Sequence, residues 1–216
     1  MTRALHIALL FGLATASSTA SSTVASPVDR SWDFSVLLDG SEIGYHRFQL
    51  TEEDGQRRLT SEAKFDVRFL FINAFRYRHT NTEVWSDGCL ERMEASTRAN
   101  GKELSVSGLR DDSGFVVDDG EEQSSLDDCV MTFAYWNPEF LQQPRLLNPQ
   151  SGEYLDVEVV RVGQEPIVVR GEEVPAFVYR ITARKMELKL WYSEDDEWLA
   201  LESVAKGGRI LRYELT

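Results

Sequence analysis

The sequence has few of the residues on which common enzyme chemistry depends. It contains 2 cysteines and 3 histidines among 216 residues, and one of these histidines is His6, near the N-terminus. No H-E-x-x-H motif and no Cys/His cluster is present, so a transition-metal site would have few ligands to draw on. A G-x-S-x-G motif, a glycine-rich phosphate loop and a dinucleotide fingerprint are also missing. We therefore expect no metal site and no cofactor.

Positive charge is scarce as well. The chain has 23 lysines and arginines against 36 aspartates and glutamates, a formal net charge of -13. Affinity for nucleic acid depends on clustered basic side chains that neutralise phosphates, and no such cluster is present. Nucleic acid is not expected as a partner.

The longest uncharged stretch lies close to the N-terminus. Arg3 precedes an apolar stretch over 4–14, and 15–26 consists almost entirely of Ala, Ser and Thr, with a small-x-small pattern ending at Ala25. This order is typical of a secretory signal peptide, so we expect residues 1–25 to be one, cleaved after Ala25. The apolar stretch is shorter than the ~20 residues that span a bilayer, and no later segment reaches that length. We expect a periplasmic or secreted protein without a transmembrane segment after signal removal; the alternative is an N-terminal helix that stays in the fold.

Cys89 and Cys129 are the only cysteines. An even count in an exported chain favours a disulfide. This bridge would close a loop of about 41 residues and stabilise the fold by roughly 4 kcal/mol. A redox-active pair is the alternative, but it usually has a C-x-x-C spacing that is missing here.

Tight-turn dipeptides divide the rest of the chain into alternating segments. They permit the positive φ angles of hairpins, and they are Asp39-Gly40, Asp54-Gly55, Asp87-Gly88, Asn100-Gly101, Asp119-Gly120 and Gly207-Gly208. In 58–69, polar residues alternate with mostly apolar ones, which is the period of a strand with one buried face. The predicted strands are 32–38, 42–51, 58–69, 75–86, 89–99, 102–110, 114–118, 154–163, 165–170, 173–183, 186–193, 197–205 and 208–215.

These short connections predict an all-β fold. Strands joined by very short turns must be antiparallel neighbours, and a meander of ten or more strands curls into a barrel or half-barrel. We expect one such β domain over 26–216. The segment 127–152 lacks alternation, and we interpret it as a plug or lid within the concavity, tied by Cys129, with short helices near 129–135 and 138–142 and a tight turn before Gly152.

One strand carries a mixed aromatic and ionisable row. In 76–86, the residues Tyr77, His79, Asn81, Glu83 and Trp85 share one parity and should face the concavity. Such a row either satisfies itself by hydrogen bonds or lines a pocket that receives a ligand, and acid–base catalysis by a histidine and glutamate is a third possibility. His46 has the parity to join this row. The candidate ligand-binding residues are Tyr77, His79, Glu83, Trp85 and Trp136; no catalytic residue is assigned.

The strongest apolar run after the N-terminal segment is 69–75. It predicts either a buried strand or strand-to-strand connection, or an exposed apolar rim that touches lipid or a protein partner.

Several short motifs together resemble an uncharacterised family of bacterial exported proteins, a domain of unknown function. The resemblance covers nearly the whole chain after the signal segment and implies no activity. The opening hairpin is also similar to exported β families with the half-barrel of lipoprotein carriers, which implies an apolar ligand by fold analogy alone. The motifs are Trp32-x-Phe34, Leu38-Asp39-Gly40-x-x-Ile43-Gly44, Glu83-x-Trp85-x-Asp87-Gly88, Tyr135-Trp136-Asn137-Pro138, Leu147-Asn148-Pro149-x-x-Gly152, Leu190-Trp191-Tyr192 and Gly208-Arg209-x-Leu211-x-Tyr213.

Three functions follow from these patterns. The first is a non-catalytic binding module that holds an apolar or lipid-like molecule in the barrel concavity. The second is a structural or interaction protein of the cell envelope with a filled core, whose partner is an envelope protein. The third is an enzyme, which would need His79 and Glu83 within hydrogen-bond reach of each other in an open cleft.

Overall fold

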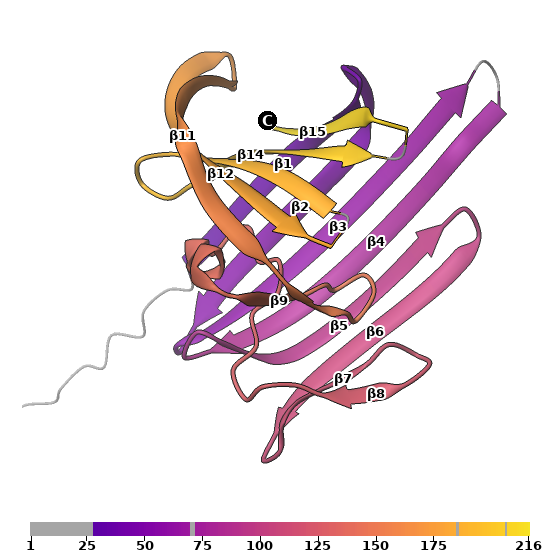
Figure 1. Ribbon diagram of the computed structural model, residues 1–216, viewed down its shortest axis with the longest axis vertical. Helices are drawn as coiled ribbons and strands as arrows, with labels where there is room; N and C mark the ends of the chain where they lie inside the picture. Colours follow the sequence, from indigo (N-terminus) through magenta and orange to yellow (C-terminus); the bar gives the residue numbers. More distant parts are fainter. Residues whose placement is uncertain (1–27, 70–71, 185, 206) are drawn as a thin grey trace, which may run out of the picture.

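A computed structural model describes residues 28–69, 72–184, 186–205 and 207–216. Thirteen strands form one antiparallel sheet in the order β11-β12-β13-β14-β15-β1-β2-β3-β4-β5-β6-β7-β8, and β9 pairs with β10 beside it (Figure 1). The elements are β1 (Val28–Leu38), β2 (Ser41–Glu53), β3 (Gln56–Phe69), β4 (Ile72–Ser86), β5 (Cys89–Ala99), β6 (Lys102–Asp111), β7 (Gly114–Asp118), β8 (Gln123–Ser125), η1 (Pro138–Gln142), β9 (Arg145–Leu147), β10 (Tyr154–Asp156), β11 (Glu158–Val169), β12 (Glu172–Ala183), β13 (Met186–Tyr192), β14 (Trp198–Ala205) and β15 (Arg209–Leu215). In the described residues β11 and β8 do not pair, so the sheet is an open half-barrel and the predicted all-β meander is confirmed.

Two-residue turns join β2 to its neighbours β1 and β3, and β5 to its neighbours β4 and β6. Asp39-Gly40, Asp54-Gly55, Asp87-Gly88 and Asn100-Gly101 all have positive φ at both residues. This backbone matches the right-handed twist of the flanking strands, and glycine adopts it without steric cost. The tight hairpin turns predicted at these four dipeptides are therefore confirmed.

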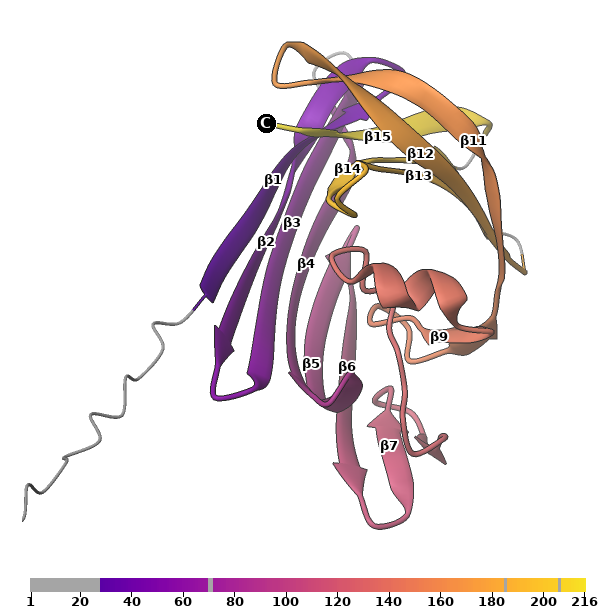
Figure 2. The same ribbon diagram turned by 90° about the vertical axis from the view of Figure 1, so that its left-hand side faces the viewer.

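The sheet curves strongly, and Figure 2 shows β11 and β12 returning over the segment that contains η1 and β9. Buried and exposed side chains alternate along the strands, and the buried ones form the core inside this curve. In β3 the side chains of Leu59, Ala63 and Phe65 are buried, while Glu62 and Lys64 between them are exposed. A large twisted sheet buries one face by curling over it. The concave face is thus the interior of the protein.

Strands β2 and β3 approach very closely at Gly44, which pairs with Phe65. Gly44 has a φ of 152°, and a Cβ added there would collide with the backbone carbonyl oxygen of Lys64. Only glycine fits this position without displacing the neighbouring strand.

The segment between β8 and β10 lies on the concave side, but its first part is not helical. The predicted helix near 129–135 is wrong, because residues 130–132 pair with neighbouring segments instead: Leu90 N donates to Val130 O over 3.2 Å, and Leu147 N donates to Met131 O over 2.9 Å. The carbonyls of Val130 and Met131 thus accept hydrogen bonds from two different segments, and both side chains are buried. This pairing satisfies both neighbours, which one helical turn could not.

The second predicted helical turn is confirmed as η1. Asn137 caps it, because its Oδ1 accepts the N–H of Glu139 over 3.2 Å, and Pro138 occupies the first position. Proline is favoured there because its missing N–H would have no partner within the helix. The tight turn before Gly152 is also present, since Gly152 N donates to Asn148 O over 2.9 Å. The predicted helical plug is therefore a single 3₁₀ turn within an otherwise non-helical segment.

The predicted strands 154–163 and 165–170 differ from the structure. Most of both belongs to one strand, β11, which begins at Glu158 and passes through Gly163, where its register with β12 shifts. Gly163 and Pro166 are residues that usually interrupt a strand, but a strand at the edge of a sheet tolerates both.

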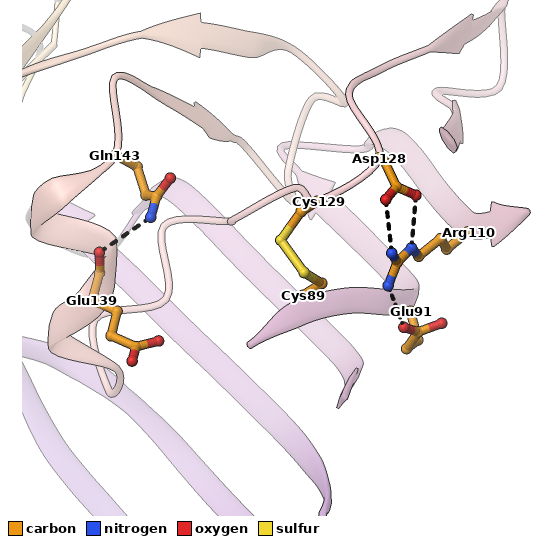
Figure 3. The surroundings of a disulfide bond; sticks show 7 residues. All are labelled: Cys89, Glu91, Arg110, Asp128, Cys129, Glu139 and Gln143. Carbon is orange, nitrogen blue, oxygen red and sulfur yellow. Dashed lines mark hydrogen bonds and ion pairs between the residues drawn. A yellow bond between two sulfur atoms is a disulfide. The ribbon is translucent and has the colours of Figure 1, made fainter. Parts of the chain in front are cut away.

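The disulfide between Cys89 and Cys129 ties the start of β5 to the plug segment (Figure 3). Beside it, Arg110 donates two hydrogen bonds to Asp128, from Nε over 3.0 Å and from Nη2 over 2.9 Å, and one to Glu91 over 2.8 Å. The guanidinium holds the pKa of Asp128 below its usual value. The covalent bond and the ion pairs together anchor the entry of the chain into the concavity.

Two regions named in the sequence analysis lie wholly or partly outside the described residues. The predicted signal peptide 1–25 is outside them, as are Leu70 and Phe71 of the apolar run 69–75. The rest of this run belongs to the end of β3 and the start of β4, where Phe69 pairs with Ile72 and Phe75 is exposed. Its role as a buried connection or as an exposed apolar rim stays a prediction. Within the described part of the chain, no helix is long and apolar enough to span a bilayer.

Candidate functional site

A cavity of about 220 Å³ lies on the concave face. Its walls come from the inner faces of β2, β3 and β4, from β13, β14 and β15, and from the plug segment between Phe133 and Gln150. The plug therefore divides the concavity without filling it. Ligand sites for drug-sized molecules usually measure ~300–1,000 Å³, so this cavity suits a small molecule or a short part of a larger one.

The mixed row on β4 faces this interior, as its parity predicted. His79, Asn81, Glu83 and Trp85 are all buried, and Tyr77 is half-buried. Alternate residues on the same strand are half-buried or exposed on the convex side. Five side chains that carry polar groups thus face one side of the sheet.

Glu83 is 1% exposed, and its carboxylate accepts hydrogen bonds from its own strand. Asn81 Nδ2 donates to Oε1 over 2.9 Å, and Trp85 Nε1 donates to Oε2 over 3.1 Å. Burial raises the pKa of Glu83, and these hydrogen bonds oppose the rise. The Glu83 network is largely satisfied from within the protein.

The two histidines of the cavity are held neutral. Burial lowers the pKa of His79 to about 4, and its Nδ1 lies 2.8 Å from Thr97 Oγ1. Burial, with a smaller contribution from nearby His79, lowers the pKa of His46 to about 3. A buried imidazole without a carboxylate partner loses its proton readily, so both rings are uncharged at neutral pH.

His46 is also poorly satisfied. Its ring packs against Phe48 with centroids 4.1 Å apart. Both ring nitrogens are buried and have no hydrogen-bond partner among the described residues, and the same holds for Asn81 Oδ1. A buried polar group without a partner costs about 1–3 kcal/mol, and both of these residues line the cavity.

Aromatic rings form much of the remaining wall. Tyr77 stacks on Phe65 with centroids 5.0 Å apart, and its hydroxyl donates to Gln150 Oε1 over 2.8 Å. This hydrogen bond joins β4 to the turn of the plug. Tyr135 from the plug and Tyr213 from β15 line the same cavity.

The structure brings most of the predicted ligand-binding residues together. Tyr77, His79, Glu83 and Trp136 line the cavity. Trp85 does not: it is fully buried behind Trp136, with ring centroids 5.8 Å apart. Ligand binding by the four cavity residues stays a prediction.

Residues distant in sequence complete the wall and were not among the predicted ligand-binding residues. They come from β13, β14, β15 and the plug, and no local pattern links them to β4. They include Phe133, Tyr135, Gln150, Met186, Ser203 and Tyr213.

The pairing that an acid–base mechanism would need is not formed. His79 interacts with Thr97, and Glu83 accepts from Asn81 and Trp85. Within the described residues, no group of three or more His, Cys, Asp or Glu side chains could hold a metal ion.

Comparison with known proteins places the chain in a family. A family model described as a domain of unknown function, DUF6134, matches residues 34–216. The chain belongs to this family. The resemblance to an uncharacterised β-rich family is thereby confirmed. A search of curated proteins found no match.

A solved structure supports the fold of this DUF6134 member. The crystal structure of a beta-barrel-like protein of the domain of unknown function DUF1849 from Brucella abortus matches with a TM-score of 0.62 and 11% sequence identity. The match covers 86% of this chain and 94% of the other. At this identity the similarity concerns the fold alone.

Proposed function

We propose that this protein is a non-catalytic binding module that holds a small ligand in the concave cavity. The observation that carries the proposal is the wall itself, where aromatic rings surround buried polar atoms of His46 and Asn81 that have no partner among the described residues. A ligand with an apolar body and a neutral hydrogen-bonding group fits such a wall. An apolar or lipid-like molecule is the class of partner that we infer.

We place this activity in the periplasm or outside the cell. The N-terminal segment has the order of a signal peptide, and the disulfide suits an oxidising compartment. Fractionation of cells that express the full chain, with detection of a processed N-terminus after Ala25, tests this placement. A full-length protein retained in the cytoplasm would contradict it.

The first experiment on binding is native mass spectrometry of the mature protein, followed by organic extraction and analysis of what is released. A stoichiometric adduct of small mass supports the proposal. The matched variants are Ser203→Phe, which fills the cavity, and Val204→Phe, its neighbour on β14, which is 60% exposed. Since adjacent residues of a strand point to opposite faces, only Ser203→Phe should abolish the adduct.

Loss of the adduct in both variants, or retention in both, would contradict binding in this cavity. Circular dichroism of each variant first establishes that the sheet is intact. A chain that carries no adduct from any preparation, and that binds no added apolar probe, would also contradict the proposal.

A second candidate is an interaction protein of the cell envelope. The observation in its favour is the edge strand β11, where Val160, Val162 and Val168 are exposed apolar residues. Cross-linking from each of these positions in intact cells tests it. A single protein cross-linked through β11 but not through exposed Leu109 on β6 would support this function.

A further inference from the structure

A groove of about 510 Å³ lies beyond the plug from the cavity. It is lined by the start of β1, the start of β3, the residues before η1 and the turn between β13 and β14. Trp136 lines both the groove and the cavity, and its ring forms part of the wall between them.

Two arginines form one side of this groove. The guanidinium of Arg30 lies 5.6 Å from the ring centroid of Trp32, and that of Arg57 lies 5.2 Å from the ring centroid of Trp136. Neither guanidinium makes a side-chain hydrogen bond or an ion pair with any described residue. A guanidinium on an aromatic face keeps its N–H edge available, and that edge matches carboxylate and phosphate oxygens.

Two buried donors belong to residues that line the same groove. Asn137 is 4% exposed, and the orientation of its amide is set because Oδ1 accepts the N–H of Glu139. Its Nδ2 is therefore the donor, and this atom is buried without a partner among the described residues. The indole Nε1 of Trp136 is also a buried donor without a partner among the described residues. Both residues line the groove, so the two donors without an acceptor lie at its wall, and an unsatisfied buried donor is energetically costly.

The other side of the groove is acidic. Asp195, Asp196 and Glu197 line it from the β13–β14 turn, and all three are exposed. Among the described residues, no ion pair joins these carboxylates to Arg30 or Arg57, although opposite charges share one groove. Side chains of opposite charge therefore line the same groove without a direct ion pair between them.

We propose that this groove binds a zwitterionic group, with an oxyanion against Arg30, Arg57 and Asn137 and an ammonium against the carboxylates of the β13–β14 turn. An oxyanion alone would meet the repulsion of the acidic side and of a chain with net charge -13. A ligand that carries both charges meets complementary groups on both sides. Amino-alkyl phosphates have this chemistry, either free or as a lipid headgroup. The proposal does not depend on binding in the cavity, because the two sites share only Trp136.

Isothermal titration calorimetry with O-phosphoethanolamine at low salt tests the site. Arg57→Gln and Arg30→Gln should each weaken binding about tenfold, whereas Arg180→Gln, an exposed arginine on β12 outside the groove, should leave the affinity within about twofold. Asn137→Asp keeps the capping oxygen and removes the N–H donor, so it should weaken binding while the fold is retained. Equal loss in all the arginine variants would reveal unspecific charge attraction and overturn the proposal.

Two further titrations identify the ligand chemistry. Inorganic phosphate alone and ethanolamine alone should each bind at least tenfold more weakly than the conjugate; phosphate that binds as tightly as the conjugate would overturn the role of the acidic side. Dihexanoylphosphatidylethanolamine distinguishes the sources. Tighter binding than the headgroup, lost in Ser203→Phe, indicates a lipid that also enters the cavity, and equal affinity indicates a free small molecule.

Discussion

Acidification tests whether the cavity keeps its histidines neutral. In the folded protein the pKa of His46 is lowered to about 3 and that of His79 to about 4, from an ordinary value of 6.5. Below 6.5 the unfolded chain binds protons that the folded chain does not. The stability that these neutral rings contribute is therefore present above 6.5 and is lost as the pH falls toward the folded values.

The expected magnitude follows from the width of the pH interval. Each pH unit below 6.5 lowers the free energy of unfolding by roughly 1.36 kcal/mol per histidine, until the pKa of that histidine in the folded protein is reached. From pH 7 to pH 5 the loss is about 2 kcal/mol for each ring, or about 4 kcal/mol together. Glu83 acts in the opposite direction, because its raised pKa favours the folded state as the pH falls. Carboxylates with a lowered pKa, such as Asp128, lose their contribution only at lower pH.

Urea unfolding at pH 7 and pH 5 measures this loss. His46→Asn should reduce the difference between the two pH values by about 2 kcal/mol, and His79→Asn should do the same. The comparison uses the change with pH, so any constant effect of the substitution cancels. If His46→Asn shows the same pH dependence as the wild type, the ring is protonated or solvated in the folded state, and the reasoning is refuted.

Three further substitutions have distinct expected outcomes. Cys89→Ser with Cys129→Ser should lower the free energy of unfolding by about 4 kcal/mol, from the sequence separation of 40 that the bridge closes, and an unchanged urea midpoint would contradict this. Gly44→Ala should cost more than about 3 kcal/mol or prevent folding, whereas Gly171→Ala, in open space, should cost about 1 kcal/mol. Tyr77→Phe and Gln150→Leu should each cost about 1 kcal/mol in thermal unfolding, and the double variant should cost less than their sum, because one hydrogen bond joins the two side chains.

Local patterns predicted most of the sheet because the relevant physics is local. The alternation in 58–69 appears as buried Leu59, Ala63 and Phe65 in β3, and turn dipeptides such as Asp54-Gly55 end strands where they were expected to. Period and turn chemistry are properties of a few adjacent residues, so one sequence suffices to recognise them.

The plug could not be predicted in the same way. The segment 129–135 contains residues that tolerate a helix, but its backbone instead pairs with Leu90 and Leu147, which are distant in sequence. The cavity depends on similar long-range contacts, because Tyr135 and Tyr213 meet β4 only after the sheet curls. Parity placed Trp85 on the correct face but could not tell that Trp136 would cover it.

The pairing of β1 with β15, with Phe34 opposite Leu215, brings the first and last strands together in the middle of the sheet. The strands β11 to β15 and the strands β1 to β8 become one sheet only when β15 pairs with β1. These two strands are the most distant in sequence. Contacts of such long range slow folding. Until β15 arrives, β1 and β14 each present an unpaired edge that could recruit another chain. Truncation of β15 should therefore leave two half-sheets with unpaired edges in place of one continuous sheet, and should promote aggregation.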